Sequence, residues 1–169
     1  MNYAQIRNMD ISNGKGIGVS LFVSGCHFHC EGCFNKETWD FNYGKHWDSI
    51  TELYFLSLLS KDYISRVSIL GGEPLADENA VDVLRLIELI RHNHPNKKIW
   101  LFTGYTMSEA INNPIRRKCI RCADYVVDGR FDINQKDLNL DFRGSKNQII
   151  WTHQDIEEFI TKRFLKTTK

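Results

Sequence analysis

The sequence lacks any apolar stretch long enough to cross a membrane, and it has almost no excess of charge. Its 22 Lys and Arg residues balance 21 Asp and Glu residues to leave a net charge of +1. Neutralising nucleic-acid phosphates needs a clustered excess of basic residues, so we expect no nucleic-acid partner. Residues 1–10 lack the apolar core of a signal peptide. We therefore expect a cytoplasmic protein that does not associate with a membrane.

The chain is also too short for a complete eight-stranded β/α barrel. Its 169 residues contain 3 prolines and no internal repeat or low-complexity segment. A closed barrel of this kind takes about 250 residues, whereas one ordinary domain takes about 100–200. We therefore expect a single domain over residues 1–169. A domain of this size folds without disulfides or a structural metal, so a bound metal would serve chemistry.

Apolar residues alternate along the chain between the spacing of strands and that of helices. We expect strands over residues 16–24, 66–70, 98–103, 123–127 and 147–151. Helices are expected after a cap at Asp48, between Pro74 and Pro95, over residues 108–122 with an interruption at Pro114, and over residues 155–164. Strands that alternate with helices predict an α/β fold with parallel strands and right-handed crossovers.

Three of the 5 cysteines lie within eight residues, in the order Cys26-His-Phe-His-Cys30-Glu-Gly-Cys33, directly after the first expected strand. The odd count and close spacing argue against disulfides and favour metal ligation. Thiolates select zinc, Cu(I) or iron–sulfur clusters. Zinc would need a fourth ligand such as His27 or His29. A four-iron cluster on three cysteines would leave one iron open to a small molecule.

A second motif, Gly71-Gly72-Glu73-Pro74, ends the next expected strand. The carboxyl ends of parallel strands meet at one edge of a sheet, so this turn should lie beside the cysteine loop. Glycines let the backbone approach a ligand closely, and Glu73 offers an acceptor for a cationic amine. The two motifs together predict one site that holds both a metal and a small molecule.

In this order, the two motifs resemble those of the radical S-adenosylmethionine enzymes. Most of these enzymes have an aromatic residue just before the third cysteine, but here Gly32 precedes Cys33 and the aromatic Phe34 follows it. That variation is similar to the activases of anaerobic ribonucleoside-triphosphate reductase. Further matching motifs span residues 71–75, 103–105, 127–131 and 143–148, so the resemblance extends from about residue 10 to residue 151.

The resemblance implies a [4Fe-4S] cluster on Cys26, Cys30 and Cys33, with S-adenosyl-L-methionine as the second cofactor. Reductive cleavage of this cofactor would give a 5′-deoxyadenosyl radical, which abstracts hydrogen from a glycine of the reductase and leaves a glycyl radical. The protein would supply orientation and the cofactors the difficult chemistry, without a general acid or base. The implied partners are the reductase and a reduced flavodoxin-type electron donor.

The resemblance also implies a fold and a set of contacts. The fold is a partial (β/α) barrel of about five to six mostly parallel strands, of the radical S-adenosylmethionine type. Residues 71–73 would receive the methionyl amine. The backbone around Gly32, Cys33 and Phe34 would approach the adenine, and Asp128 would contact the ribose.

Two other functions remain open on the sequence alone. The chain could activate a different glycyl-radical enzyme, or it could be a non-catalytic zinc-binding module that uses His29 beside the three cysteines. Cys119 and Cys122 form a second closely spaced pair. No further thiols remain to complete a four-ligand site around them, and we interpret Cys122 as a buried apolar residue rather than part of the site.

Overall fold

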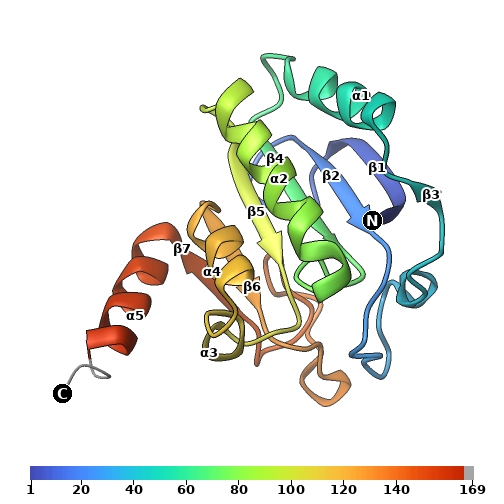
Figure 1. Cartoon of the computed structure of the whole chain (residues 1–169). Helices are drawn as coiled ribbons and strands as arrows, with labels where there is room; N and C mark the ends of the chain where they lie inside the picture. Colours follow the sequence, from blue (N-terminus) through green and yellow to red (C-terminus); the bar gives the residue numbers. More distant parts are fainter. Residues whose placement is uncertain (166–169) are drawn as a thin grey trace.

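A computed structural model describes residues 1–165 of the chain, and seven strands in it form one sheet. In spatial order the sheet runs β3-β1-β2-β4-β5-β6-β7 (Figure 1). The strands are β1 (Asn2–Asp10), β2 (Gly18–Val23), β3 (Lys45–His46), β4 (Arg66–Gly71), β5 (Lys98–Phe102), β6 (Tyr125–Asp128) and β7 (Ile149–Thr152).

Parallel pairing is confined to the centre of the sheet. Strands β2, β4, β5 and β6 pair in parallel, whereas β1 pairs antiparallel with β2 and β3, and β6 pairs antiparallel with β7. The predicted α/β class is confirmed. The prediction of five to six mostly parallel strands is wrong, because β1 and β3 were missed and half of the pairings are antiparallel. The sheet does not close into a barrel.

Three of the helices within residues 1–165 begin at a residue whose side chain caps them. The helices are α1 (Ser49–Leu59), α2 (Asp77–Asn93), α3 (Met107–Ala110), α4 (Pro114–Arg121) and α5 (His153–Leu165), with short 3-10 turns η1 (Lys36–Trp39) and η2 (Ile133–Gln135). The Asp48 carboxylate accepts a hydrogen bond from Thr51 N at 2.8 Å, which confirms the predicted cap. Pro114 occupies the first turn of α4, so the expected interruption is the boundary between α3 and α4.

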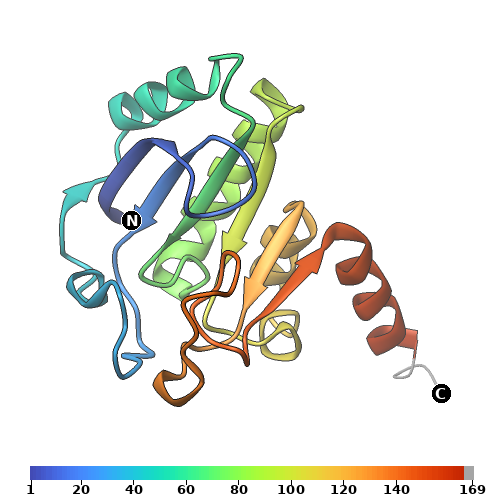
Figure 2. The same ribbon diagram turned by 180° about the vertical axis from the view of Figure 1, so that it is seen from behind.

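The two faces of the sheet differ in what covers them. Helices α1, α2 and α4 lie on one face (Figure 1), whereas the other face carries no α-helix within residues 1–165 but is crossed by the chain between β1 and β2 (Figure 2). Alternation along the strands places the fully buried Leu21, Ile69 and Leu101 in the hydrophobic core. The intervening Phe22, Leu70 and Phe102 therefore face the helix-free side. None of the helices in the described part of the chain could span a membrane.

The packing of α2 on the sheet leads to a stability prediction. Leu86 is fully buried, whereas Val81 on the same helix is 59% exposed. Leu86→Ala should lower the free energy of unfolding by about 2–5 kcal/mol, because it removes buried methyl groups and leaves a cavity. Val81→Ala should change it by less than about 0.5 kcal/mol. Urea unfolding followed by circular dichroism measures both, and equal effects would contradict the assigned orientation of α2.

Candidate metal centre

The cysteine loop follows β2 and begins at a position where only glycine fits. Gly25 has φ of +97°, and an added Cβ there would overlap the ring of Phe41. Its N–H donates to Thr38 O at 2.7 Å, and Cys26 N–H donates to Trp39 O at 3.0 Å. The short turn η1 is thereby hydrogen-bonded to the start of the cysteine loop. Backbone contacts place Cys26, and its thiol accepts further hydrogen bonds from the backbone of Phe28 and His29.

Phe28 anchors the middle of the cysteine loop, a role that the sequence did not reveal. Its ring lies edge-on to Tyr105 with 4.8 Å between centroids, and the Arg130 guanidinium lies over it at 4.5 Å. A Cβ on Gly104 would lie 2.5 Å from the Phe28 ring, so a glycine is needed there for this contact. The loop is therefore fixed to the segments that follow β5 and β6.

The three thiols of this loop line one pocket, and each is partly exposed. Burial raises the pKa of the Cys26 and Cys30 thiols above their usual value, and for Cys30 the neighbouring Cys33 raises it further. Iron binds the thiolate, so loading a metal here releases protons. Asn35 N–H donates to Cys33 Sγ at 3.4 Å. Three soft donors in one loop fit an iron–sulfur cluster.

The two histidines of the loop are engaged elsewhere. His27 Nε2 lies 2.9 Å from a carboxylate oxygen of Glu78, and the His29 ring stacks on Trp39 at 4.6 Å. Among the described residues, no three His, Cys, Asp or Glu side chains gather closely enough to hold a single metal ion. The fourth zinc ligand that a closed zinc site requires is thus not supplied by His27 or His29 in this arrangement.

The turn formed by residues 71–73 lies directly against the cysteine loop, as expected from the sequence. Gly72 N–H donates to Val23 O at 2.8 Å, and Glu73 N–H donates to Gly25 O at 2.7 Å. Gly71 has φ of +109°, and a Cβ on Gly72 would lie 2.5 Å from Gly25 O. Both glycines are therefore required for the close approach of the two backbones.

The side chain of Glu73 makes hydrogen bonds within the protein that the sequence did not predict. It is 2% exposed, and its Oε1 accepts hydrogen bonds from Leu75 N at 2.8 Å and Thr103 Oγ1 at 2.7 Å. Its Oε2 accepts one from Gly104 N at 2.7 Å and keeps a free lone pair. Burial raises the pKa of Glu73 to about 7. The carboxylate thus joins the turn after β4 to the end of β5.

A cavity of about 560 Å³ connects these motifs on the helix-free face of the sheet. Cavities of roughly 300–1,000 Å³ are typical of small-molecule sites. Besides the three cysteines, Phe34 and residues 71–73 line it. The lining extends to Arg7, Ser12 and Asn13 on one side and to Leu138, Leu140 and Phe142 on the other.

Two residues assigned from the sequence lie outside the lining of this cavity. Asp128 is buried, and its Oδ2 accepts a hydrogen bond from Met107 N at 2.6 Å, so it fixes the start of α3. Gly129 and Arg130 line the cavity instead. Gly32 has φ of +70°, and a Cβ there would lie 2.7 Å from Ile133 Cδ1. Gly32 thus allows the close approach of η2 to the loop.

The motif over residues 143–148 fixes the segment that follows β6. Gln148 Oε1 accepts hydrogen bonds from Gly144 N at 2.9 Å and Ser145 N at 3.2 Å, and its Nε2 donates to Gly129 O at 2.9 Å. This segment brings Phe131 against Phe34, with 5.1 Å between ring centroids. The motif therefore builds one wall of the cavity beside the third cysteine.

The cavity and its three cysteines are those of an iron–sulfur protein, and a family described as "4Fe-4S single cluster domain" matches residues 12–151. Relatives named "Anaerobic ribonucleoside-triphosphate reductase-activating protein" occur in Escherichia coli K12 (40% identical) and Pasteurella multocida (38%), each over 89% of this chain and 97% of the relative. A relative with the same name in Enterobacteria phage T4 is 36% identical over 92% of this chain and 96% of its own. The chain belongs to this family of reductase-activating proteins, which confirms the resemblance found in the motifs.

The raised pKa of Glu73 leads to a prediction for the cluster-free protein. Folding favours the protonated form, so the stability contributed by Glu73 is complete below its usual pKa and is lost as pH rises through about 7. In Glu73→Gln the side-chain amide nitrogen faces the Gly104 N–H and cannot accept its hydrogen bond. This should lower the free energy of unfolding by about 1–3 kcal/mol near pH 5. The difference from wild type should shrink towards about pH 8.

Urea unfolding at several pH values measures this difference. The control is Glu88→Gln, which removes an exposed ion pair to Lys118 at 2.6 Å. Exposed pairs contribute little to stability, so this variant should behave like wild type at every pH. A constant difference between Glu73→Gln and wild type across the pH range would contradict the assignment.

Proposed function

We propose that this protein activates an anaerobic ribonucleoside-triphosphate reductase by forming a glycyl radical on it. The observation that carries the proposal is the backbone hydrogen bond from Glu73 to Gly25 at 2.7 Å, which holds the turn of residues 71–73 against the cysteine loop. Metal ligands and a turn suited to a small molecule thus share one cavity. The relatives' printed name supplies the reductase as the partner.

In this proposal Cys26, Cys30 and Cys33 hold the [4Fe-4S] cluster, and residues 71–73 bind the methionyl amine of S-adenosyl-L-methionine. When bound, the cluster supplies the electron that cleaves this cofactor to methionine and a 5′-deoxyadenosyl radical, which abstracts hydrogen from a glycine of the reductase. Phe34 and Arg130 line the cavity, and in this proposal they contact the nucleoside. The protein's task is to orient and to exclude competing hydrogen donors.

The sheet does not close into a barrel, and this affects how the reductase would reach the cavity. We interpret the parallel strands β2, β4, β5 and β6 as part of an incomplete barrel of the radical S-adenosylmethionine type. The cavity is lined from the face that carries no α-helix among the described residues (Figure 2), and we propose that a loop of another protein reaches it from that face. For the electron we propose a reduced flavodoxin-type donor, because the reaction consumes one electron.

Substitution of the cysteines tests the proposal. Cys26→Ala, Cys30→Ala or Cys33→Ala should each abolish the formation of 5′-deoxyadenosine, because every one removes a cluster ligand. The matched control is Cys119→Ala, since Cys119 is buried against α2, with its Sγ 3.6 Å from Ala80 O, and lies outside the cavity. This variant should keep both the cluster and cofactor cleavage. Iron and sulfide content after anaerobic reconstitution, together with chromatography of the products, measures both.

Paramagnetic resonance on an added anaerobic reductase tests the partner. Wild-type protein should be brown, lose colour with dithionite and produce a glycyl-radical doublet on the reductase. Colourless protein with one zinc per chain would refute the cluster. Cofactor cleavage without the doublet would instead indicate that another glycyl-radical enzyme is the substrate.

A further inference from the structure

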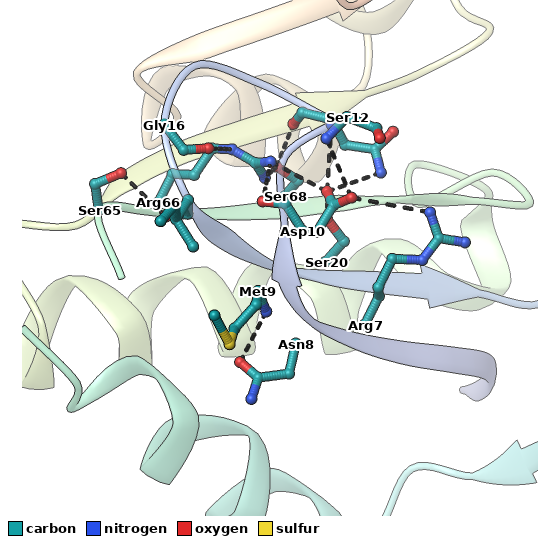
Figure 3. Close-up of polar contacts among 12 residues, drawn as sticks. Arg7, Asn8, Met9, Asp10, Ser12, Gly16, Ser20, Ser65, Arg66 and Ser68 are labelled. Atoms are coloured by element: carbon teal, nitrogen blue, oxygen red, sulfur yellow. Dashed lines mark hydrogen bonds and ion pairs between the residues drawn. The ribbon is translucent and has the colours of Figure 1, made fainter. Parts of the chain in front are cut away.

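A buried ion pair lies at the end of the helix-free face opposite the cysteines. Arg66, the first residue of β4, is 0% exposed, and its guanidinium donates to acceptors from three segments of the chain (Figure 3). Nη2 donates to Asp10 O at 2.8 Å and to Asp10 Oδ2 at 3.1 Å, Nε donates to Gly16 O at 3.2 Å, and Nη1 donates to Ser68 Oγ at 2.6 Å.

The carboxylate of Asp10 gathers the rest of this network. It accepts hydrogen bonds from Ser12 N, from Asn13 N and Nδ2, and from Ser20 Oγ at 2.6 Å. Burial alone would raise the pKa of Asp10, but the bonds from Ser20 and Arg66 lower it below the usual value. The carboxylate therefore stays ionised, and Arg66 remains paired.

This network fixes the segment over residues 11–17, which we term the floor loop. The loop joins the end of β1 to the start of β2, at the amino end of the parallel strands. Its Ser12 and Asn13 line the same cavity as the three cysteines. A Cβ on Gly14 would lie 2.9 Å from Trp100, whose ring centroid lies 5.2 Å from that of Phe142, another residue that lines the cavity. The floor loop thus bounds the cavity at the end away from the proposed cluster.

Stability alone does not account for an ion pair at this position. Well-packed apolar residues in place of a buried ion pair are often as stable or more stable. What a guanidinium adds is a planar set of donors that holds several acceptors in one arrangement. Here those acceptors are Asp10 at the end of β1, Gly16 in the floor loop and Ser68 in β4. Arg66 therefore sets where the floor loop lies on the sheet.

We propose that Arg66 and Asp10 are positioning residues that keep the floor loop closed over the amino end of the cavity. The inference rests on the proposed function, because it concerns what reaches a radical formed there. A thiol that enters donates its sulfur-bound hydrogen atom to the 5′-deoxyadenosyl radical, giving 5′-deoxyadenosine and a thiyl radical. The glycine of the reductase then keeps its hydrogen. A closed floor directs the radical to the glycine.

Arg66→Lys separates the geometry of the network from its charge. Lysine keeps the positive charge but cannot hold three segments with one planar group. The matched control is Arg91→Lys on α2, since Arg91 also joins separate segments, donating to Cys122 O at 2.8 Å and pairing with Asp124, but lies outside the cavity. Ser68→Ala is the milder variant, because it removes one acceptor of Arg66 and the donor to Asn13 O.

The first readout uses reconstituted protein with reductase and a thiol in D₂O. Hydrogen on the glycine Cα does not exchange with solvent, whereas the thiol carries deuterium. Deuterated 5′-deoxyadenosine therefore measures how often the radical takes its hydrogen atom from the thiol. The measured quantity is the amount of deuterated 5′-deoxyadenosine per glycyl radical formed, which we term the deuterated share. We expect it to rise several-fold in Arg66→Lys, to rise less in Ser68→Ala and to stay at the wild-type value in Arg91→Lys.

The second readout uses cluster-free protein. Hydrogen exchange at the amides of the floor loop should accelerate about tenfold in Arg66→Lys, because each lost bond to a charged group shifts local opening by roughly that factor. Faster exchange with an unchanged deuterated share would show a merely structural role and overturn the proposal, as would a rise in Arg91→Lys. Wild-type protein that forms no glycyl radical would overturn the proposed function first. If Arg66→Lys does not fold, Ser68→Ala decides by the same two measurements.

Discussion

The site depends on one backbone hydrogen bond, from Glu73 N to Gly25 O at 2.7 Å. It joins the segment that follows β4 to the segment that follows β2, which are neighbouring parallel strands. Such strands deliver their carboxyl ends to the same edge, but only glycines at positions 71 and 72 let the two backbones meet there. The buried carboxylate of Glu73 extends the connection to the end of β5. Three successive strand ends are thereby held as one frame for the cysteine loop.

The parts of this frame that the sequence predicted are those encoded locally. The spacing of Cys26, Cys30 and Cys33 and the turn at residues 71–73 lie in short motifs, and parallel order is enough to bring them together. The cap at Asp48 and the interruption at Pro114, which starts α4, likewise act within one helical turn. Strand β1 was not predicted, because most of its residues are exposed or half-buried and their burial does not alternate regularly.

The contacts that were missed join residues far apart in the chain. The sequence analysis placed Arg66 only within an expected strand. Its ion pair was missed because its partner Asp10 precedes it by 56 residues. The role of Phe28 was missed because Gly104, on which it packs, lies beyond three further strands, β3, β4 and β5. Asp128 was placed at the correct edge of the sheet, yet its side chain turns to Met107 N and not to the cavity. Position along a strand fixes the edge, but tertiary contacts decide where the side chain goes.

The two ends of the cavity handle charge in opposite ways. At the amino end the Asp10 carboxylate has a buried guanidinium partner and a lowered pKa. At the carboxyl end Glu73 has hydrogen-bond donors and a pKa raised to about 7, and its charge raises the pKa of Cys26. Burial is the main cause of both raised pKa values, so a positive charge beside these groups would favour their ionised forms. A ligand with a cationic amine and a sulfonium would supply positive charge at this end, which is a reason for our proposal that S-adenosyl-L-methionine binds here while the other end forms a fixed wall.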